Sequence, residues 1–137
     1  MTEALVSFVD TNVLFDVLTN DPRWAEWSIR QLEVAAIKGA IGINDVVYAE
    51  LSVRYAGVED VDEVVERAGL RFERIPRSAL FLAGKAFQRY RSQGGRRTTI
   101  LPDFFIGAHA ATLGVPLLTR DARRYRSYFP TLELVTP

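Results

Sequence analysis

Five short runs of mostly apolar residues occur along the chain. They lie at residues 4–9, 40–43, 70–75, 115–119 and 132–135, and their length and composition predict β-strands. Segments with a helical spacing of apolar residues separate the first four runs. Strands that alternate with helices are typical of right-handed crossovers and of a parallel sheet covered on both faces. The pattern therefore predicts an α/β fold with a mostly parallel central sheet of about five strands.

End signals place the helices between these strands. Asp21-Pro22 predicts an N-cap and a first-turn proline for a helix that ends at Gly39. Asn44 or Asp45 begins the next helix, which is predicted to end near Gly57. Two helices therefore follow each of the first three strands, and no helix separates the last two. The other helical segments are 58–68, 78–93, 102–113 and one with apolar positions from Val13 to Leu18.

Composition narrows the possible chemistry. The 137 residues are enough for one domain, 1–137, with a sizeable core. The chain has no cysteine, which excludes disulfides, thiolate zinc sites and cysteine nucleophiles. His109 is the only histidine, which excludes a histidine pair for metal-free acid/base cleavage. We therefore expect any metal to have oxygen ligands.

The N-terminal segment and the hydropathy bear on localisation. The first ten residues have no basic segment followed by a long apolar core, and no apolar run approaches the length of a membrane span. We expect a soluble cytoplasmic protein with no membrane association.

Charge is distributed unevenly, although the formal net charge is zero. Residues 1–69 carry 13 acidic and 5 basic side chains, whereas residues 70–137 carry 4 and 12. This asymmetry predicts two faces of opposite charge, of which the basic one would attract a polyanion. The alternative is that folding mixes the charges into salt bridges.

Acidic residues follow strands or begin helices at three places. Asp10 follows the first strand, Asp121 comes two residues after Thr119 at the end of the fourth, and Asp103 lies in the first turn of a helix. Ligands of an open parallel sheet bind beyond the carboxyl ends of its strands. Each acid also has an ordinary interpretation: Asp10 as a helix cap, Asp103 as a partner of the helix dipole and Asp121 as a turn residue. Thr11 or Asn12 is likewise a candidate cap of the first helix.

Glu50 is a fourth candidate because it lies beside apolar positions of its helix. Its neighbours at i−4, i−3 and i+3 are Val46, Val47 and Val53. An ion pair with Arg54 at i+4 is the simple explanation. We favour a carboxylate directed inward at a polar site, because burial without compensation is costly.

Four converging carboxylates would need a counter-charge. Two like charges 4 Å apart repel by about 4 kcal/mol at an effective dielectric constant near 20. Either some acids take up protons or a divalent cation binds, and a set of oxygen donors selects Mg²⁺ or Mn²⁺. A metal-bound water activated by a carboxylate would then hydrolyse phosphodiesters. Asn12 and Thr119 are suited to orient groups in such a site without adding charge.

These residues resemble a known family. The segments "VDTNVLFDVL", the helical Glu50, "LPDFFIGAHAATLGVPLLTRDARRYRSYF" and "LELVTP" are together similar to PIN-domain ribonucleases, specifically to VapC-type toxins of type II toxin–antitoxin systems. The likeness covers essentially the whole chain. The individual motifs are short, so their order and spacing carry the resemblance.

The resemblance implies a fold, an activity and partners. The fold is a three-layer α/β/α sandwich, and the activity is that of a Mg²⁺- or Mn²⁺-dependent endoribonuclease that cleaves RNA. The protein would be a homodimer inhibited by a small antitoxin that covers the active site. The family's acids and polar site residues fall, without departure, on Asp10, Glu50, Asp103, Asp121, Thr119 and Asn12.

Other residues have candidate roles around this site. The arginines near the acids, Arg96, Arg97, Arg120, Arg123, Arg124 and Arg126, are candidates for phosphate contacts. For Tyr125, Tyr128 and Phe129 we favour packing over base stacking, and for His109 a structural or interfacial role. The helices 21–38 and 58–68 either pack in the core or form the antitoxin groove or the dimer contact.

Other classes of protein also place acids at strand ends. A phospho-accepting signalling receiver needs a lysine after a late strand, but Lys38 and Lys85 lie in predicted helices. A haloacid-dehalogenase-like phosphatase needs a second aspartate where this chain has Asn12. A non-catalytic PIN scaffold is a further alternative, against which the presence of all four acids counts.

Overall fold

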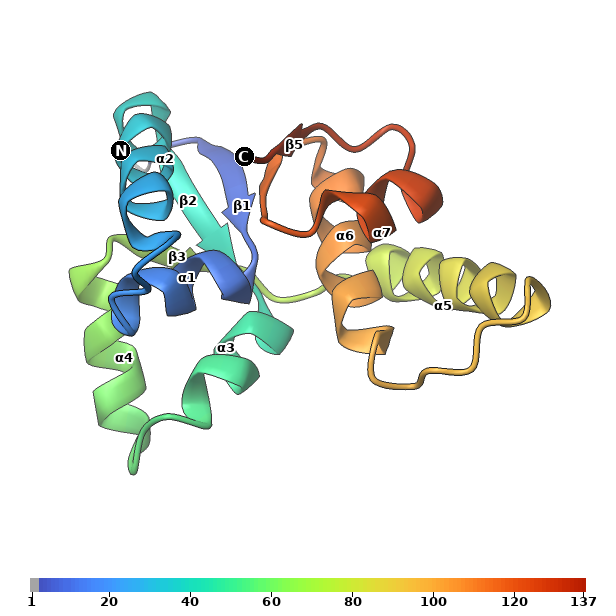
Figure 1. Ribbon diagram of the computed structural model, residues 1–137, viewed down its shortest axis with the longest axis horizontal. Helices are drawn as coiled ribbons and strands as arrows, with labels where there is room; N and C mark the ends of the chain where they lie inside the picture. The colour runs from blue at the N-terminus through green and yellow to red at the C-terminus, as the bar shows by residue number, and fades with distance from the viewer. Residues whose placement is uncertain (1–2) are drawn as a thin grey trace.

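The computed structural model describes residues 3–137, and residues 1 and 2, with which the predicted domain 1–137 begins, lie outside the described part. Five strands alternate with seven helices in this part of the chain (Figure 1). Their order is β1 (Leu5–Val9), α1 (Thr11–Leu18), α2 (Ala25–Lys38), β2 (Ala40–Ile43), α3 (Asp45–Ser52), α4 (Val58–Arg67), β3 (Leu70–Phe72), α5 (Arg77–Ser92), α6 (Leu101–Leu113), β4 (Leu117–Leu118), α7 (Ala122–Tyr128) and β5 (Leu134–Val135).

The strands form one sheet in the order β3-β2-β1-β4-β5. Every neighbouring pair is parallel, so the predicted mostly parallel sheet is parallel throughout. In the centre, Phe8 of β1 lies opposite Gly42 of β2 on one side and Leu117 of β4 on the other. The strand order changes direction at β1, because the chain first adds strands on one side of β1 and then returns to the other side.

The helices cover the two faces of the sheet in separate groups. Right-handed crossovers in opposite directions put their helices on opposite faces. Accordingly, α1 to α4 lie on one side of the strands, and α5 to α7 lie on the other (Figure 1). The fold is therefore the three-layer α/β/α sandwich that the resemblance predicted.

The two halves of the charge pattern map onto these two layers. The acidic half of the sequence contains α1 to α4, and the basic half contains α5 to α7. Among residues 3–137, only the ion pair of Arg120 with Asp16 joins the halves. Within the described residues the two halves therefore lie mostly in different layers with one ion pair between them, which favours two faces of opposite charge over a general salt-bridged mixture.

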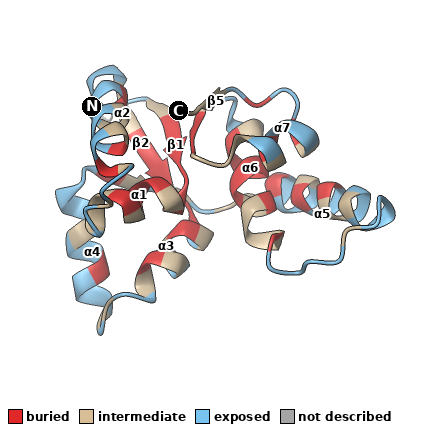
Figure 2. Cartoon of the chain, viewed as in Figure 1, coloured by how far each residue is buried: buried red, intermediate tan, exposed pale blue. Residues whose placement is uncertain are grey.

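The core lies between the sheet and both helical layers. Strands β1 and β2 are mostly buried, whereas the outward faces of α4 and α5 are exposed (Figure 2). His109 of α6 is also buried: its ring lies 4.7 Å from that of Phe8, and its Nδ1 is 3.3 Å from Nδ2 of Asn44. This confirms a structural role for the only histidine. None of the helices between residues 3 and 137 is both long and apolar enough to span a bilayer.

Two predicted helix boundaries differ from the structure, and one helix was not predicted. The helix expected from Asp21-Pro22 begins at Ala25, because the Asp21 carboxylate accepts bonds from the amides of Arg23 and Trp24 and closes a separate turn. The helix expected to end near Gly57 already ends at Ser52, and Gly57 is instead the N-cap of α4. A helix, α7, also separates the last two strands, where none was predicted.

Candidate active site

The candidate site lies where the strand order changes direction, between β1 and β4. Asp10 directly follows β1, and Thr119 directly follows β4. The amide of Asp10 donates to the carbonyl of Leu118 at 2.8 Å, which continues the ladder between these strands. The carboxyl ends of β1 and β4 therefore place both side chains at the topological switch point, where open α/β sheets bind ligands.

Asp10 is buried and held by three side-chain donors. Its Oδ2 accepts from Thr119 Oγ1 at 2.8 Å, from the Tyr125 hydroxyl at 2.9 Å and from Asn12 Nδ2 at 3.3 Å. Only 4% of the residue is exposed. The carboxylate therefore has a fixed orientation, set by the neighbouring Asn12 and by two groups from the distant segment around β4 and α7.

Thr119 and Asn12 connect this carboxylate to the loop after β4. The Thr119 hydroxyl accepts from the amide of Asp121 at 3.0 Å, so its own hydrogen is available for Asp10. Asn12 Oδ1 accepts from the amide of Arg120 at 3.2 Å. The loop that carries Asp121 is thus held against the start of α1.

None of the three polar residues after β1 caps helix α1. Asp10 occupies the N-cap position but makes no side-chain bond to the helix amides, and the Thr11 hydroxyl donates to Glu50 Oε1 at 2.6 Å. Asn12 makes the contacts with Asp10 and Arg120. The interpretation of Thr11 or Asn12 as a cap is therefore wrong, and all three side chains face the site.

Glu50 approaches the site from helix α3. Asn44 begins this helix, because its side chain accepts from the amides of Val46 and Val47. Within residues 3–137, Glu50 forms no ion pair with Arg54, whose guanidinium lies 5.8 Å from the centre of the Phe15 ring. The half-buried Glu50 carboxylate instead faces Thr11, in the inward direction predicted, although Val53, one of the neighbours used for that prediction, is 86% exposed at the end of the helix.

Asp103 and Asp121 share one cation, Arg124. Asp103 lies in the first turn of α6, and its Oδ2 contacts Arg124 Nη1. The same nitrogen is 3.7 Å from Asp121 Oδ2. Asp121 is the N-cap of α7 and makes no side-chain bond to its amides. These two carboxylates therefore lie on either side of one guanidinium group.

Burial and mutual repulsion raise the pKa values of three of the carboxyl groups. Burial is the main cause for Asp10, whose pKa is also raised by the charge of Glu50 and lowered by the bonds from Thr119 and Tyr125. Burial raises the pKa of Glu50, helped by the charge of Asp103. Burial and the charge of Asp10 raise the pKa of Asp103 to about 6, against the effect of Arg124. The acids thus lie close enough to disfavour one another's ionisation.

The donor set suits a hard divalent cation. Carboxylate, amide and hydroxyl oxygens are present without sulfur or histidine, and the acids already attract the guanidinium of Arg124. Between residues 3 and 137, however, no three acidic or histidine side chains are gathered into a ready set of ligands. Mg²⁺ commonly binds through one or two carboxylates and several waters, so the arrangement fits that mode better than a shell of four acids.

One nearby acid, Asp16, has a structural role. Its buried carboxylate accepts from Ser28 Oγ at 2.7 Å and from Arg120 Nε and Nη2 at 2.7 and 3.0 Å. Arg120 also lies over the Trp24 ring. Arg120 is therefore engaged within the chain, which argues against its predicted phosphate contact.

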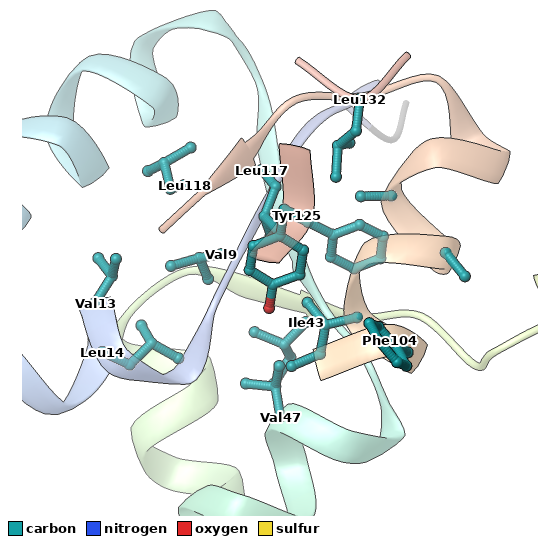
Figure 3. Packing of buried hydrophobic residues seen from close by; sticks show 14 of the residues in the cluster. Val9, Val13, Leu14, Ile43, Val47, Phe104, Leu117, Leu118, Tyr125 and Leu132 are labelled. Carbon is teal, nitrogen blue, oxygen red and sulfur yellow. The ribbon is translucent and has the colours of Figure 1, made fainter. Parts of the chain in front are cut away.

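Sequence reasoning did not assign Tyr125 or Thr11 to the site. Tyr125 was interpreted as packing, and it is indeed buried within the core (Figure 3), but its hydroxyl also reaches Asp10. A signal for this contact was present, because Tyr125 lies one helical turn after Asp121. For Thr11, the signal was that three polar residues follow β1 where one would suffice as a cap.

Comparisons with known proteins agree with this fold. A family model described as the PIN domain matches residues 7–129. No protein of curated function matches the chain. Among solved structures, a chain of VapBC2 from Rickettsia felis, bound to a DNA fragment from their promoter, has a TM-score of 0.74 and 19% identity over 97% of this chain and 99% of that one.

Two further structures are similar over nearly their full length. A chain of DNA-bound VapBC from Salmonella typhimurium has a TM-score of 0.71 at 18% identity and covers 97% of this chain and 98% of its own. A toxin–antitoxin complex from Klebsiella pneumoniae gives 0.69 at 20% identity, with 96% and 97% covered. At these identities the likeness establishes the fold.

Proposed function

The chain belongs to the PIN domain family, and from this we propose that it is a metal-dependent endoribonuclease of the VapC type. It would act as the toxin of a toxin–antitoxin pair, hydrolysing RNA phosphodiester bonds until a small antitoxin inhibits it. Single-domain architecture over residues 1–137 and homodimer formation belong to the same proposal.

The observation that carries the proposal is the electrostatic coupling of the acids around the sheet's switch point. Asp10, Glu50 and Asp103 come from three separate elements, yet each raises the pKa of another. Mutual repulsion of these carboxylates lowers the stability of the folded protein. Without a ligand for the carboxylates, nothing would offset this loss. The arrangement is therefore best explained by a bound cation.

We propose that Asp10 and Asp103 hold Mg²⁺ or Mn²⁺, with Asp121 and Glu50 acting directly or through water. A bound ion would supply an activated water and would neutralise charge on the phosphate. Thr119, Asn12 and Tyr125 orient Asp10, while Thr11 orients Glu50. Glu50 is the candidate base, because burial raises the pKa of its carboxyl group and Thr11 is a fixed donor to it.

The basic layer supports RNA as the substrate. Arg123 and Arg126 are exposed on α7, the helix that follows Asp121, and Arg96 and Arg97 are exposed in the loop before α6. Arg124 contacts the carboxylates of Asp103 and Asp121. It is placed to contact a phosphate once a bound metal replaces it as the counter-charge of these acids. Tyr125 has no exposed surface, so it is not available for base stacking.

The antitoxin is proposed because the similar structures include toxin–antitoxin complexes. The first candidate surface is helix α2, on which Ile29, Val34 and Ile37 are exposed. Helix α4 adds the exposed Val58 and an acidic outer face. These apolar positions would accept an amphipathic helix or a second copy of this chain.

Purified protein is expected to cleave RNA when Mg²⁺ or Mn²⁺ is added and to be inactive in EDTA. Production of the protein alone is expected to arrest growth, and co-production of the small protein encoded beside its gene is expected to restore it. Metal-independent cleavage, or soluble protein with no effect on RNA or growth, would contradict the proposal.

Metal-free protein is expected to lose stability as the pH rises through about 6. Asp103 has a native pKa of about 6, above its value of 3.8 when unperturbed, so the native state binds more protons than the unfolded state between these values. The free energy of unfolding therefore falls across this window, and the raised pKa values of Asp10 and Glu50 act in the same direction. Thermal denaturation from pH 4 to 8 measures this slope.

Asp103→Asn provides the control for this pH dependence, because it removes the titrating group. Its melting temperature should fall less between pH 4 and 8 than that of the wild type. Mn²⁺ should stabilise the wild type more at pH 7.5 than at pH 5, since it binds the ionised carboxylates. An identical slope in both proteins would show that Asp103 does not titrate in this range.

A further inference from the structure

We propose that Tyr125 is a positioning residue for the metal site, acting through Asp10. This inference rests on the proposed function, because it takes Asp10 as a metal ligand. The Tyr125 hydroxyl donates to Asp10 Oδ2 at 2.9 Å, and Tyr125 is completely buried. A hydroxyl in this position contacts neither solvent nor substrate, so it acts only through the carboxylate.

The three side-chain donors to Asp10 all use the same oxygen. Thr119, Tyr125 and Asn12 reach Oδ2, and no side chain within residues 3–137 donates to Oδ1. A carboxylate whose Oδ2 is held by three side chains presents Oδ1, which no side chain in the described part of the chain holds, to a cation in a fixed orientation. Groups that orient a metal ligand in this way contribute to metal affinity.

Helix α6 fixes the ring of Tyr125 from the opposite side. A Cβ added at Gly107 would lie 2.9 Å from Cδ1 of Tyr125 and 2.7 Å from Cε2 of Phe129. Glycine inside a helix costs about 1 kcal/mol relative to alanine. Here that cost permits the close approach of α7 to α6, which brings the phenol within reach of Asp10.

This contact explains why Tyr125 has a hydroxyl at all. Its neighbours in the core are apolar (Figure 3), and phenylalanine would fill the same volume. Burying a phenol requires a hydrogen-bond acceptor, and Asp10 is that acceptor. The α7 segment therefore contributes two groups to the site, Asp121 at its N-cap and Tyr125 one turn later.

Calorimetric titration with Mn²⁺ alone tests the inference. Tyr125→Phe should bind Mn²⁺ about tenfold more weakly than the wild type. Tyr48→Phe is the matched control, because the Tyr48 hydroxyl donates to Asp62 Oδ1 at 2.7 Å, away from the site. It should bind Mn²⁺ as the wild type does. Thermal denaturation without metal checks that both variants are folded.

A second pair of variants tests the same contact with the phenol intact. Gly107→Ala displaces the Tyr125 ring and should also weaken Mn²⁺ binding by several-fold. Gly84→Ala is its control, since nothing lies within 4 Å of a Cβ at that position in α5. It should leave Mn²⁺ binding unchanged.

The possible results separate the inference from the proposed function. If Tyr125→Phe bound Mn²⁺ with wild-type affinity while Asp10→Asn did not bind it, the role of Tyr125 would be contradicted but the metal site would not. Absence of Mn²⁺ binding in the wild type would overturn the metal site and this inference with it. Weakened binding in Tyr125→Phe and Gly107→Ala, but in neither control, would establish the positioning role.

Discussion

Asp10→Asn is expected to reduce RNA cleavage by about 10³-fold or more, with no loss of fold. The metal ion would provide several kcal/mol of transition-state stabilisation, and each 1.36 kcal/mol corresponds to a factor of ten in rate. The neutral amide removes the charge that attracts the cation. Its oxygen can still accept the hydrogen bonds from Thr119 and Tyr125. Single-turnover cleavage of a labelled RNA at saturating Mn²⁺ measures the effect.

Stability separates loss of function from loss of structure in this variant. Burial raises the pKa of Asp10, so its ionised form destabilises the metal-free protein at neutral pH. Metal-free Asp10→Asn should therefore melt at the same temperature as the wild type or above it. Glu133→Gln, an exposed acid just before β5, is the control and should retain wild-type cleavage. Undiminished cleavage by Asp10→Asn would remove Asp10 from the mechanism.

Arg124→Gln is expected to change metal binding and cleavage in opposite directions. The guanidinium competes with a metal for Asp103 and Asp121, so its removal should strengthen Mn²⁺ binding by about tenfold, the equivalent of one partly buried ion pair. Cleavage should fall by about 10²-fold, because the proposed contact with the phosphate is lost. Calorimetry and cleavage rates at saturating Mn²⁺ give the two quantities separately.

Arg77→Gln is the control for charge, since Arg77 is exposed at the start of α5. It should bind Mn²⁺ like the wild type and cleave RNA at the wild-type rate. If Arg124→Gln weakened Mn²⁺ binding, the guanidinium would be supporting the metal site instead of competing with a metal. If cleavage stayed unchanged, Arg124 would have no role toward the phosphate.

The parts of the fold that depend on local patterns were predictable from the sequence. An apolar run followed by an acid predicted β1 and the position of Asp10 after it. A charged side chain needs a partner when it is buried, so a buried strand tends to end before such a residue. Val46 and Val47, one turn before Glu50, predicted that its carboxylate points inward, and it contacts Thr11; Val53, the third valine of the pattern, is exposed. The parallel sheet followed from helices between successive strands, since parallel neighbours need crossovers.

The features that local sequence patterns did not predict depend on contacts between distant segments. Helix α7 was absent from the predicted order because its seven residues include three arginines and no apolar stripe, and Tyr125 is its single buried residue. The hydroxyl contact of Tyr125 spans 115 positions in the chain, and that of Thr11 with Glu50 spans 39. Arg124 was a candidate for phosphate contact, but its position between two acids could only be seen in the folded chain.

Anomalous diffraction from crystals soaked in Mn²⁺ tests the central claim most directly, because it locates the ion without reference to activity. We expect one strong anomalous peak within coordination distance, about 2.0–2.2 Å, of carboxylate oxygens of Asp10 and Asp103. We also expect that Arg124 has moved away from Asp103. A peak only at other acidic residues, or none at saturating Mn²⁺, would contradict it.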